Sequence, residues 1–159
     1  MSAVEIEGSL FDDVADALRG MTPAALGPVH HRARRYGIKV WFGGATPPRE
    51  HYEAQVIGPD DVWRAKVLAL EVGFHSEYPQ AAENDAVIAH LVADEKRWRK
   101  IVGKEAEVGS FLGHQTSWRR VSETWADPDL SEPGLALEVA ARLVDYVRAL
   151  EPAIRRRGR

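Results

Sequence analysis

The sequence predicts an α+β fold, in which a three- to four-stranded antiparallel meander packs against an N-terminal, a long central and a C-terminal helix, in the order α-β-β-β-α-β-α. Two observations support this prediction. Residues 36–76 alternate apolar and polar side chains with period 2, interrupted by turn sequences. Residues 9–19, 80–100 and 133–150 instead repeat apolar residues at helical spacing.

The first helix is expected to run from Ser9 to about Arg19. Ser9 suits the N-cap, where its side chain can accept a backbone hydrogen bond. Asp12 and Asp13 suit the first turn, because the helix dipole favours negative charge there. Gly20 is expected to end this helix.

Three strands are expected next, over residues 36–42, 50–57 and 63–76, joined by turns rich in glycine and proline. Their alternation predicts a sheet with one apolar face against the core and one polar face. The basic run at 30–35 either extends the first strand backwards or forms an edge strand of its own. Charge on such an edge discourages aggregation.

The sequence leaves the register of the second hairpin open. With a bulge in the turn, Glu53 shares a face with Glu71 and His75, whereas without one it shares a face with Lys66. We favour the bulged form, because it puts all the apolar rows on one side.

Beyond the sheet, residues 80–100 predict the longest helix, and residues 104–115 a loop in which Phe111 and Leu112 plug an edge of the core. Residues 116–125 fit either a fourth strand or a short helix.

The last helix is expected over 133–150, followed by Pro152 and a mobile basic tail at 153–159. Residues 1–152 are therefore expected to form a single domain, and 159 residues are enough to bury a sizeable core.

Composition narrows the function classes. The formal net charge of −3 gives no general attraction to nucleic acid or to an anionic membrane. The absence of cysteine excludes disulfides, thiolate metal sites and thiol nucleophiles. There is no membrane-length apolar run and no signal-peptide pattern, so we expect a cytoplasmic protein. Arginine outnumbers lysine by 16 to 5, which is compatible with a GC-rich bacterial genome.

Four residues on the second and third strands are candidate metal ligands: His51, Glu53, Glu71 and His75. Residues two apart on a strand point the same way, about 6.6 Å apart, so these side chains can converge in the bulged register. Two imidazoles and two carboxylates suit zinc, manganese or iron. Glu53, Glu71 and His75 are also candidate acid–base catalysts. The alternative is the ordinary polar face of a sheet, with no ligand.

A second candidate site consists of Lys39, Trp41, His51 and Gln55 on the same polar face. Trp41 beside Lys39 is expected to stack a base or a sugar, and the basic run at 30–35 can add salt-sensitive affinity.

The expected function is a non-catalytic module that binds a protein or a small molecule. The first alternative is a metal-dependent hydrolase or nuclease on the polar sheet face. The second is a weak binder of single-stranded nucleic acid, which the acidic net charge disfavours. A divalent metal is the only cofactor that the residues suggest, no membrane partner is expected, and an antiparallel edge strand permits a homodimer. No nucleotide-binding, zinc-protease or serine-hydrolase motif occurs.

Overall fold

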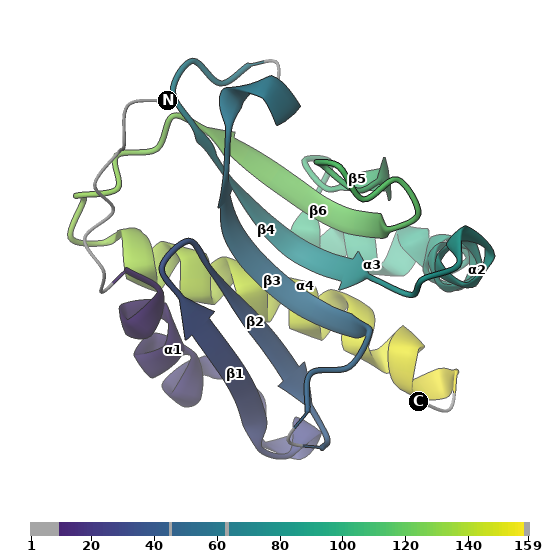
Figure 1. Cartoon of the computed structure of the whole chain (residues 1–159). Coiled ribbons are helices and arrows are strands. Elements are labelled where there is room, and N and C mark those ends of the chain that lie inside the picture. The colour runs from purple at the N-terminus through teal and green to yellow at the C-terminus, as the bar shows by residue number, and fades with distance from the viewer. Residues whose placement is uncertain (1–9, 45, 63, 158–159) are drawn as a thin grey trace.

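The computed structural model describes residues 10–44, 46–62 and 64–157, so the expected Ser9 cap lies outside the described residues. One antiparallel sheet of six strands runs through it (Figure 1). In spatial order the strands are β1 (Val29–Arg34), β2 (Gly37–Phe42), β3 (Glu50–Ile57), β4 (Ala69–Ser76), β6 (Arg119–Ala126) and β5 (Glu107–Ser110). The predicted α+β class and antiparallel sheet are confirmed. The sheet has six strands, however, where three to four were predicted.

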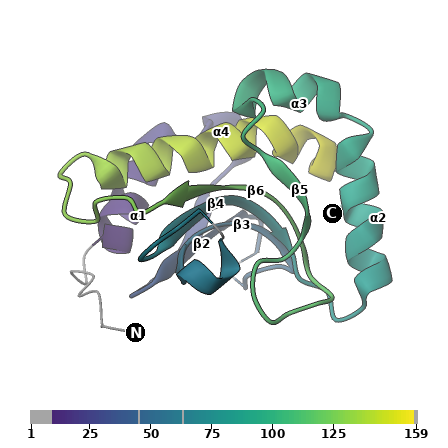
Figure 2. The same ribbon diagram turned by 90° about the horizontal axis from the view of Figure 1, so that it is seen from above.

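The helices are α1 (Leu10–Met21), α2 (Ala81–Val92), α3 (Glu95–Val102) and α4 (Leu135–Arg156), with short 3-10 turns η1 (Ala24–Leu26) and η2 (Pro59–Asp61). Helices α1, α3 and α4 lie on one side of the sheet, and α2 stands at its end (Figure 2). Within the described ranges, no helix combines the length and apolar character that a bilayer crossing requires.

The extra strands come from segments with weak sequence signals. The basic run forms its own edge strand, β1, and the expected loop at 104–115 contains β5. Of the two alternatives for 116–125, the strand is correct.

Strand β4 begins at Ala69, later than the predicted start at residue 63. The carboxylate of Asp127 accepts the backbone N–H groups of Lys66, Val67 and Leu68 at 2.7–3.2 Å. Those three amides are therefore occupied by a side chain and cannot join a strand ladder.

The predicted central helix is two helices, because the chain turns between Val92 and Glu95. This turn places α3 beside α4, as Figure 2 shows. It lets Trp98 become fully buried while its indole N–H donates to the carbonyl of Leu91 at 2.7 Å. A straight continuation of α2 would carry Trp98 away from α4.

Helix α4 runs past Pro152 to Arg156, beyond the predicted end at Leu150. Proline has no N–H to donate within the helix, and the missing hydrogen bond lowers the stability of the helix. Burial of Ala153 and Ile154 against the core offsets it. The first part of the segment expected to be a tail is therefore helical.

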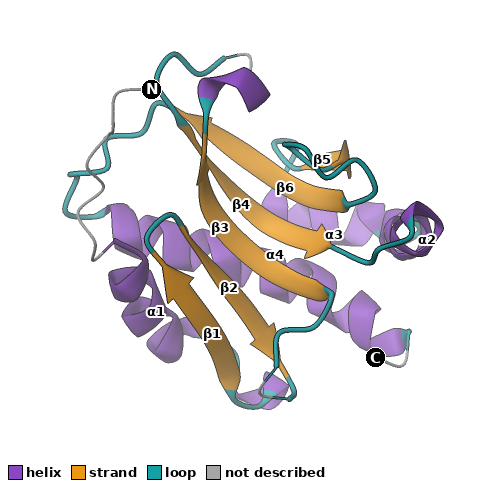
Figure 3. Cartoon of the chain, in the orientation of Figure 1, coloured by secondary structure: helices purple, strands orange, loops and turns teal. Residues whose placement is uncertain are grey.

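The main core lies between the sheet and the helices, where the apolar row of each central strand meets α1 and α4. The opposite face, which we call the helix-free face, carries Lys39, Glu53 and His75. In Figure 3 the strands of this face are turned toward the viewer, and the connection between β5 and β6 lies at its margin. Leu112 packs on a small apolar cluster there, and the Phe111 ring meets His75 edge to face at 5.0 Å. The centre of this face, around His75, is thus buried, whereas Arg32 and Arg34 on its β1 edge are exposed.

Gly73 allows β4 and β6 to approach each other closely on this face. A Cβ at this position would lie 2.4 Å from the Val121 carbonyl oxygen, and φ is 157°, which side chains rarely adopt. We expect Gly73→Ala to lower the free energy of unfolding by about 3 kcal/mol, measured by urea denaturation. Gly20→Ala, on α1 with nothing within 4 Å, is the control and should raise it slightly. Equal stability of the two variants would contradict this packing.

Candidate metal centre

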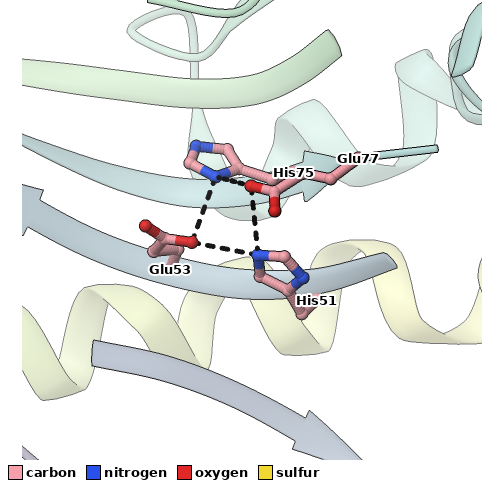
Figure 4. A group of neighbouring side chains, drawn as sticks. All are labelled: His51, Glu53, His75 and Glu77. Atoms are coloured by element: carbon pink, nitrogen blue, oxygen red, sulfur yellow. Dashed lines mark hydrogen bonds and ion pairs between the residues drawn. The ribbon is translucent and has the colours of Figure 1, made fainter. Parts of the chain in front are cut away.

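Two His-x-Glu units meet on the helix-free face. His51 of β3 is paired with His75 of β4 across the antiparallel ladder. Glu53 lies two residues after His51, and Glu77 two residues after His75. Because the strands run in opposite directions, the two glutamates approach the histidine pair from opposite sides (Figure 4).

The four side chains converge on one point: a potential ligand atom from each lies within 4.8 Å of the other three. His51 Nε2 lies 2.9 Å from Glu53 Oε1 and 3.4 Å from Glu77 Oε2. His75 Nδ1 lies 3.4 Å and 3.3 Å from the same two oxygens. All four residues are buried.

The outer nitrogen of each imidazole is held by a protein acceptor. His51 Nδ1 donates to the carbonyl of Pro48 at 3.0 Å, since a carbonyl can only accept. His75 Nε2 lies 2.9 Å from Oε2 of Glu71 and donates to that carboxylate. This support is what metal-binding histidines use, because it orients the ring and turns the other nitrogen toward the ion.

Glu71 is itself fixed by its neighbours. Its carboxylate accepts the Gln55 side-chain N–H at 2.8 Å and the Ser122 hydroxyl at 2.6 Å. Arg120 in turn donates to the Ser122 hydroxyl oxygen at 2.8 Å. Glu71 is fully buried, so this network holds it in one orientation against His75.

Glu77 lies just beyond the end of β4 and is positioned by backbone contacts. Its N–H donates to the carbonyl of Arg49 at 2.9 Å, which continues the pairing of the strands. On both sides of it, the buried Asn84 side chain accepts from the Ser76 hydroxyl at 2.7 Å and from the Tyr78 N–H at 2.9 Å. Helix α2 therefore clamps the segment that carries Glu77.

One atom at the centre lacks a hydrogen-bond partner. His75 Nδ1 is the only buried side-chain nitrogen or oxygen in this state among the described residues. The carboxylate oxygens 3.3–3.4 Å away are near enough for attraction, but not aligned for a hydrogen bond. A buried polar atom left this way is costly, and once its proton is displaced its lone pair can bind a cation between the four side chains.

Burial disfavours the charged form of each group, but mutual attraction outweighs it. The pKa of His75 is raised well above its usual value by Glu71 and Glu53, and the pKa of His51 is raised by hydrogen bonds to Glu53 and Glu77. The same contacts lower the pKa of Glu53 to about 2, and lower the pKa of Glu71 and of Glu77. Three carboxylates therefore face two imidazolium groups and the Lys39 ammonium, so the charges balance in the metal-free protein and a cation must displace imidazolium protons to bind.

The candidate metal ligands predicted from the sequence separate into two roles. The structure brings His51, Glu53 and His75 together, while Glu71 contacts the outer nitrogen of His75. Glu77 takes the fourth place, which sequence reasoning did not give it. The repeated His-x-Glu spacing at 51–53 and 75–77 is the signal that could have found it.

The other predicted ligand-binding residues, Lys39, Gln55 and Trp41, differ in what they contact. Lys39 is half-buried, with Nζ 3.5 Å from Oε1 of Glu77. Gln55 supports the carboxylate network described above. Trp41 is 3% exposed and stacks on His30 with ring centroids 5.9 Å apart, so its ring is not available to stack a ligand.

Comparison with known proteins assigns no family, because no protein-family model, curated protein or solved structure matches the chain.

The outer carboxylate gives a first test. We expect Glu71→Gln to weaken metal affinity about tenfold to hundredfold, because the amide is a poorer acceptor for the His75 N–H. Competition with a chelating dye measures this affinity. Glu138→Gln, at an exposed carboxylate on α4, is the matched control and should leave it unchanged. Equal affinities of the two variants would remove Glu71 from the site.

Proposed function

We propose that this protein is a metal-dependent hydrolase whose divalent ion is held by His51, Glu53, His75 and Glu77. The observation that carries the proposal is the convergence of these four donors within 4.8 Å, with both imidazoles supported from behind by Pro48 and Glu71. The unsatisfied Nδ1 of His75 lies at the centre of this group.

The donor set favours a transition metal. Two imidazole nitrogens and two carboxylate oxygens suit zinc, manganese, iron or cobalt, whereas magnesium and calcium prefer oxygen alone. Such an ion, when bound, polarises a substrate oxygen and lowers the pKa of water near to neutrality.

A groove supports a catalytic role over a purely structural one. Glu53 belongs to the centre and also lines an open groove together with Lys39 and Gln55. The groove therefore gives water and substrate a path toward the centre beside Glu53. The Lys39 ammonium at the same place favours a negatively charged group on the substrate.

Burial of the donors favours a second candidate function. Each of the four is at most 8% exposed. Structural metal sites are closed in this manner, so the ion can instead stabilise a non-catalytic module that binds a protein or a small molecule.

Thermal melts test the metal, and turnover separates the two functions. Adding zinc, manganese or iron(II) singly should raise the melting temperature of metal-free protein. At a hundredfold excess over Kd, the metal that binds should stabilise the fold by about 2.7 kcal/mol. The loaded protein should then hydrolyse a member of a chromogenic ester and phosphoester panel, and His51→Gln should not. Metal binding without turnover would favour the structural role, and no metal response would end both proposals.

A further inference from the structure

A basic groove of about 360 Å³ opens beside the candidate centre, at the β1–β2 edge of the sheet. Four cationic residues line it: Arg32, Arg34, Arg35 and Lys39. Glu53 also lines it, so the groove borders the metal centre at that residue. Its volume is in the range of sites for small molecules, and too small for a polymer.

Strand pairing explains why these cations gather. Arg32 is paired with Lys39, and Lys39 with Glu53, so the three lie in one row across β1, β2 and β3. Arg34 is paired with Gly37, and Gly37 with Gln55, so Arg34 begins the neighbouring row on the same face. Residues paired directly across a ladder point to the same face, which here is the helix-free face.

The arginines of this groove differ from most others in the chain. Among the described residues, no carboxylate forms an ion pair with Arg32, Arg34 or Arg35. By contrast, Arg97 and Arg142, at the helix layer, each pair with an acidic side chain at 2.6–2.7 Å. In a chain of net charge −3, uncompensated guanidinium groups at one place mark a local site for an anion.

We infer that this groove binds the phosphate group of a small phosphorylated substrate, which rests on and deepens the proposed hydrolase function. The guanidinium fork matches phosphate oxygens in pairs, and Lys39 adds a charge between the arginines and the centre. Tyr36, which also lines the groove and is 49% exposed, offers an apolar ring to the organic part of the molecule.

The test uses metal-free protein, dialysed free of chelator, because a polycarboxylate chelator would itself compete. Titration calorimetry with inorganic phosphate and pyrophosphate at low salt should show binding. Arg32→Gln and Arg34→Gln should each weaken it about tenfold, which is typical for a hydrogen bond to a charged group. Both side chains are exposed, so folding should be unaffected. Arg148→Gln, at an exposed site on α4, removes the same charge and should change nothing.

Three results would overturn the inference. They are no phosphate binding, equal weakening in all three variants, and groove-dependent binding of citrate or of a single-stranded oligonucleotide in place of phosphate. A separate metal titration of the same samples keeps the two proposals distinguishable. Failure to bind metal would end the hydrolase proposal whatever phosphate does. Metal binding in the separate titration, together with no phosphate binding, would end only the substrate assignment.

Discussion

Replacing His75 with glutamine should abolish tight metal binding without unfolding the protein. Loss of an outer-shell partner alone costs about ten- to hundredfold in affinity, so loss of a ligand should exceed a hundredfold. His75 supplies one of the four donors, and its Nδ1 is the atom without a hydrogen-bond partner. Glutamine is close in size and can still donate to Glu71, which limits the damage to packing. Metal titration, with circular dichroism to verify folding, measures the effect.

The matched control is another histidine that is not at the centre. His90 on α2 hydrogen-bonds the carbonyl of Ala153 at 2.7 Å, on the helix side of the molecule. His90→Gln should retain wild-type metal affinity. If both variants bind metal as the wild type does, His75 is not a ligand and the proposed centre is wrong.

The second large effect is that metal loading should reverse how the stability of the fold depends on pH. The metal-free protein is the reference state. The pKa values of His51 and His75 are raised on folding, so their contribution to stability is complete below about pH 6.5 and is lost as pH rises through the folded values. The pKa of Glu53 is lowered to about 2, so its contribution is present above about pH 4.5 and is lost as pH falls toward 2. These groups together favour the metal-free fold most between about pH 4.5 and 6.5.

Metal loading should reverse the loss of stability that the metal-free protein shows as pH rises. The ion must displace the imidazolium protons of His51 and His75, so affinity should rise with pH, by up to about a hundredfold per pH unit for two protons. Denaturation of both forms between pH 5 and 8 measures the difference. We expect the stabilisation by metal to grow across this range as the metal-free protein weakens. Parallel curves for the two forms would show that the ion does not compete for these protons.

Strand periodicity was sufficient to place most of the candidate site. His51, Glu53 and His75 share a face because residues two apart on a strand point the same way, and this holds in the observed register. Glu77 follows the last residue of the predicted strand, so strand periodicity alone does not place it. Its side chain reaches the centre only because the strand pairing continues past Ser76, through the Arg49 carbonyl.

The burial of the centre of the polar face could not be predicted from local pattern. Alternation shows that a face is polar, but not whether a distant loop covers it. Here Phe111 and Leu112 come from the connection between β5 and β6, far along the chain from β3 and β4. The turn between α2 and α3 likewise depends on Trp98 reaching the core beside α4, which is a tertiary contact.

The most direct test is a crystal structure of protein grown with the metal that raises its melting temperature most, with data collected at that metal's absorption edge. We expect one anomalous peak between His51 Nε2 and His75 Nδ1, about 2.0–2.2 Å from each, with Glu53 and Glu77 oxygens completing the coordination. A map with no peak there, and with His75 Nδ1 hydrogen-bonded to a carboxylate instead, would contradict the metal centre.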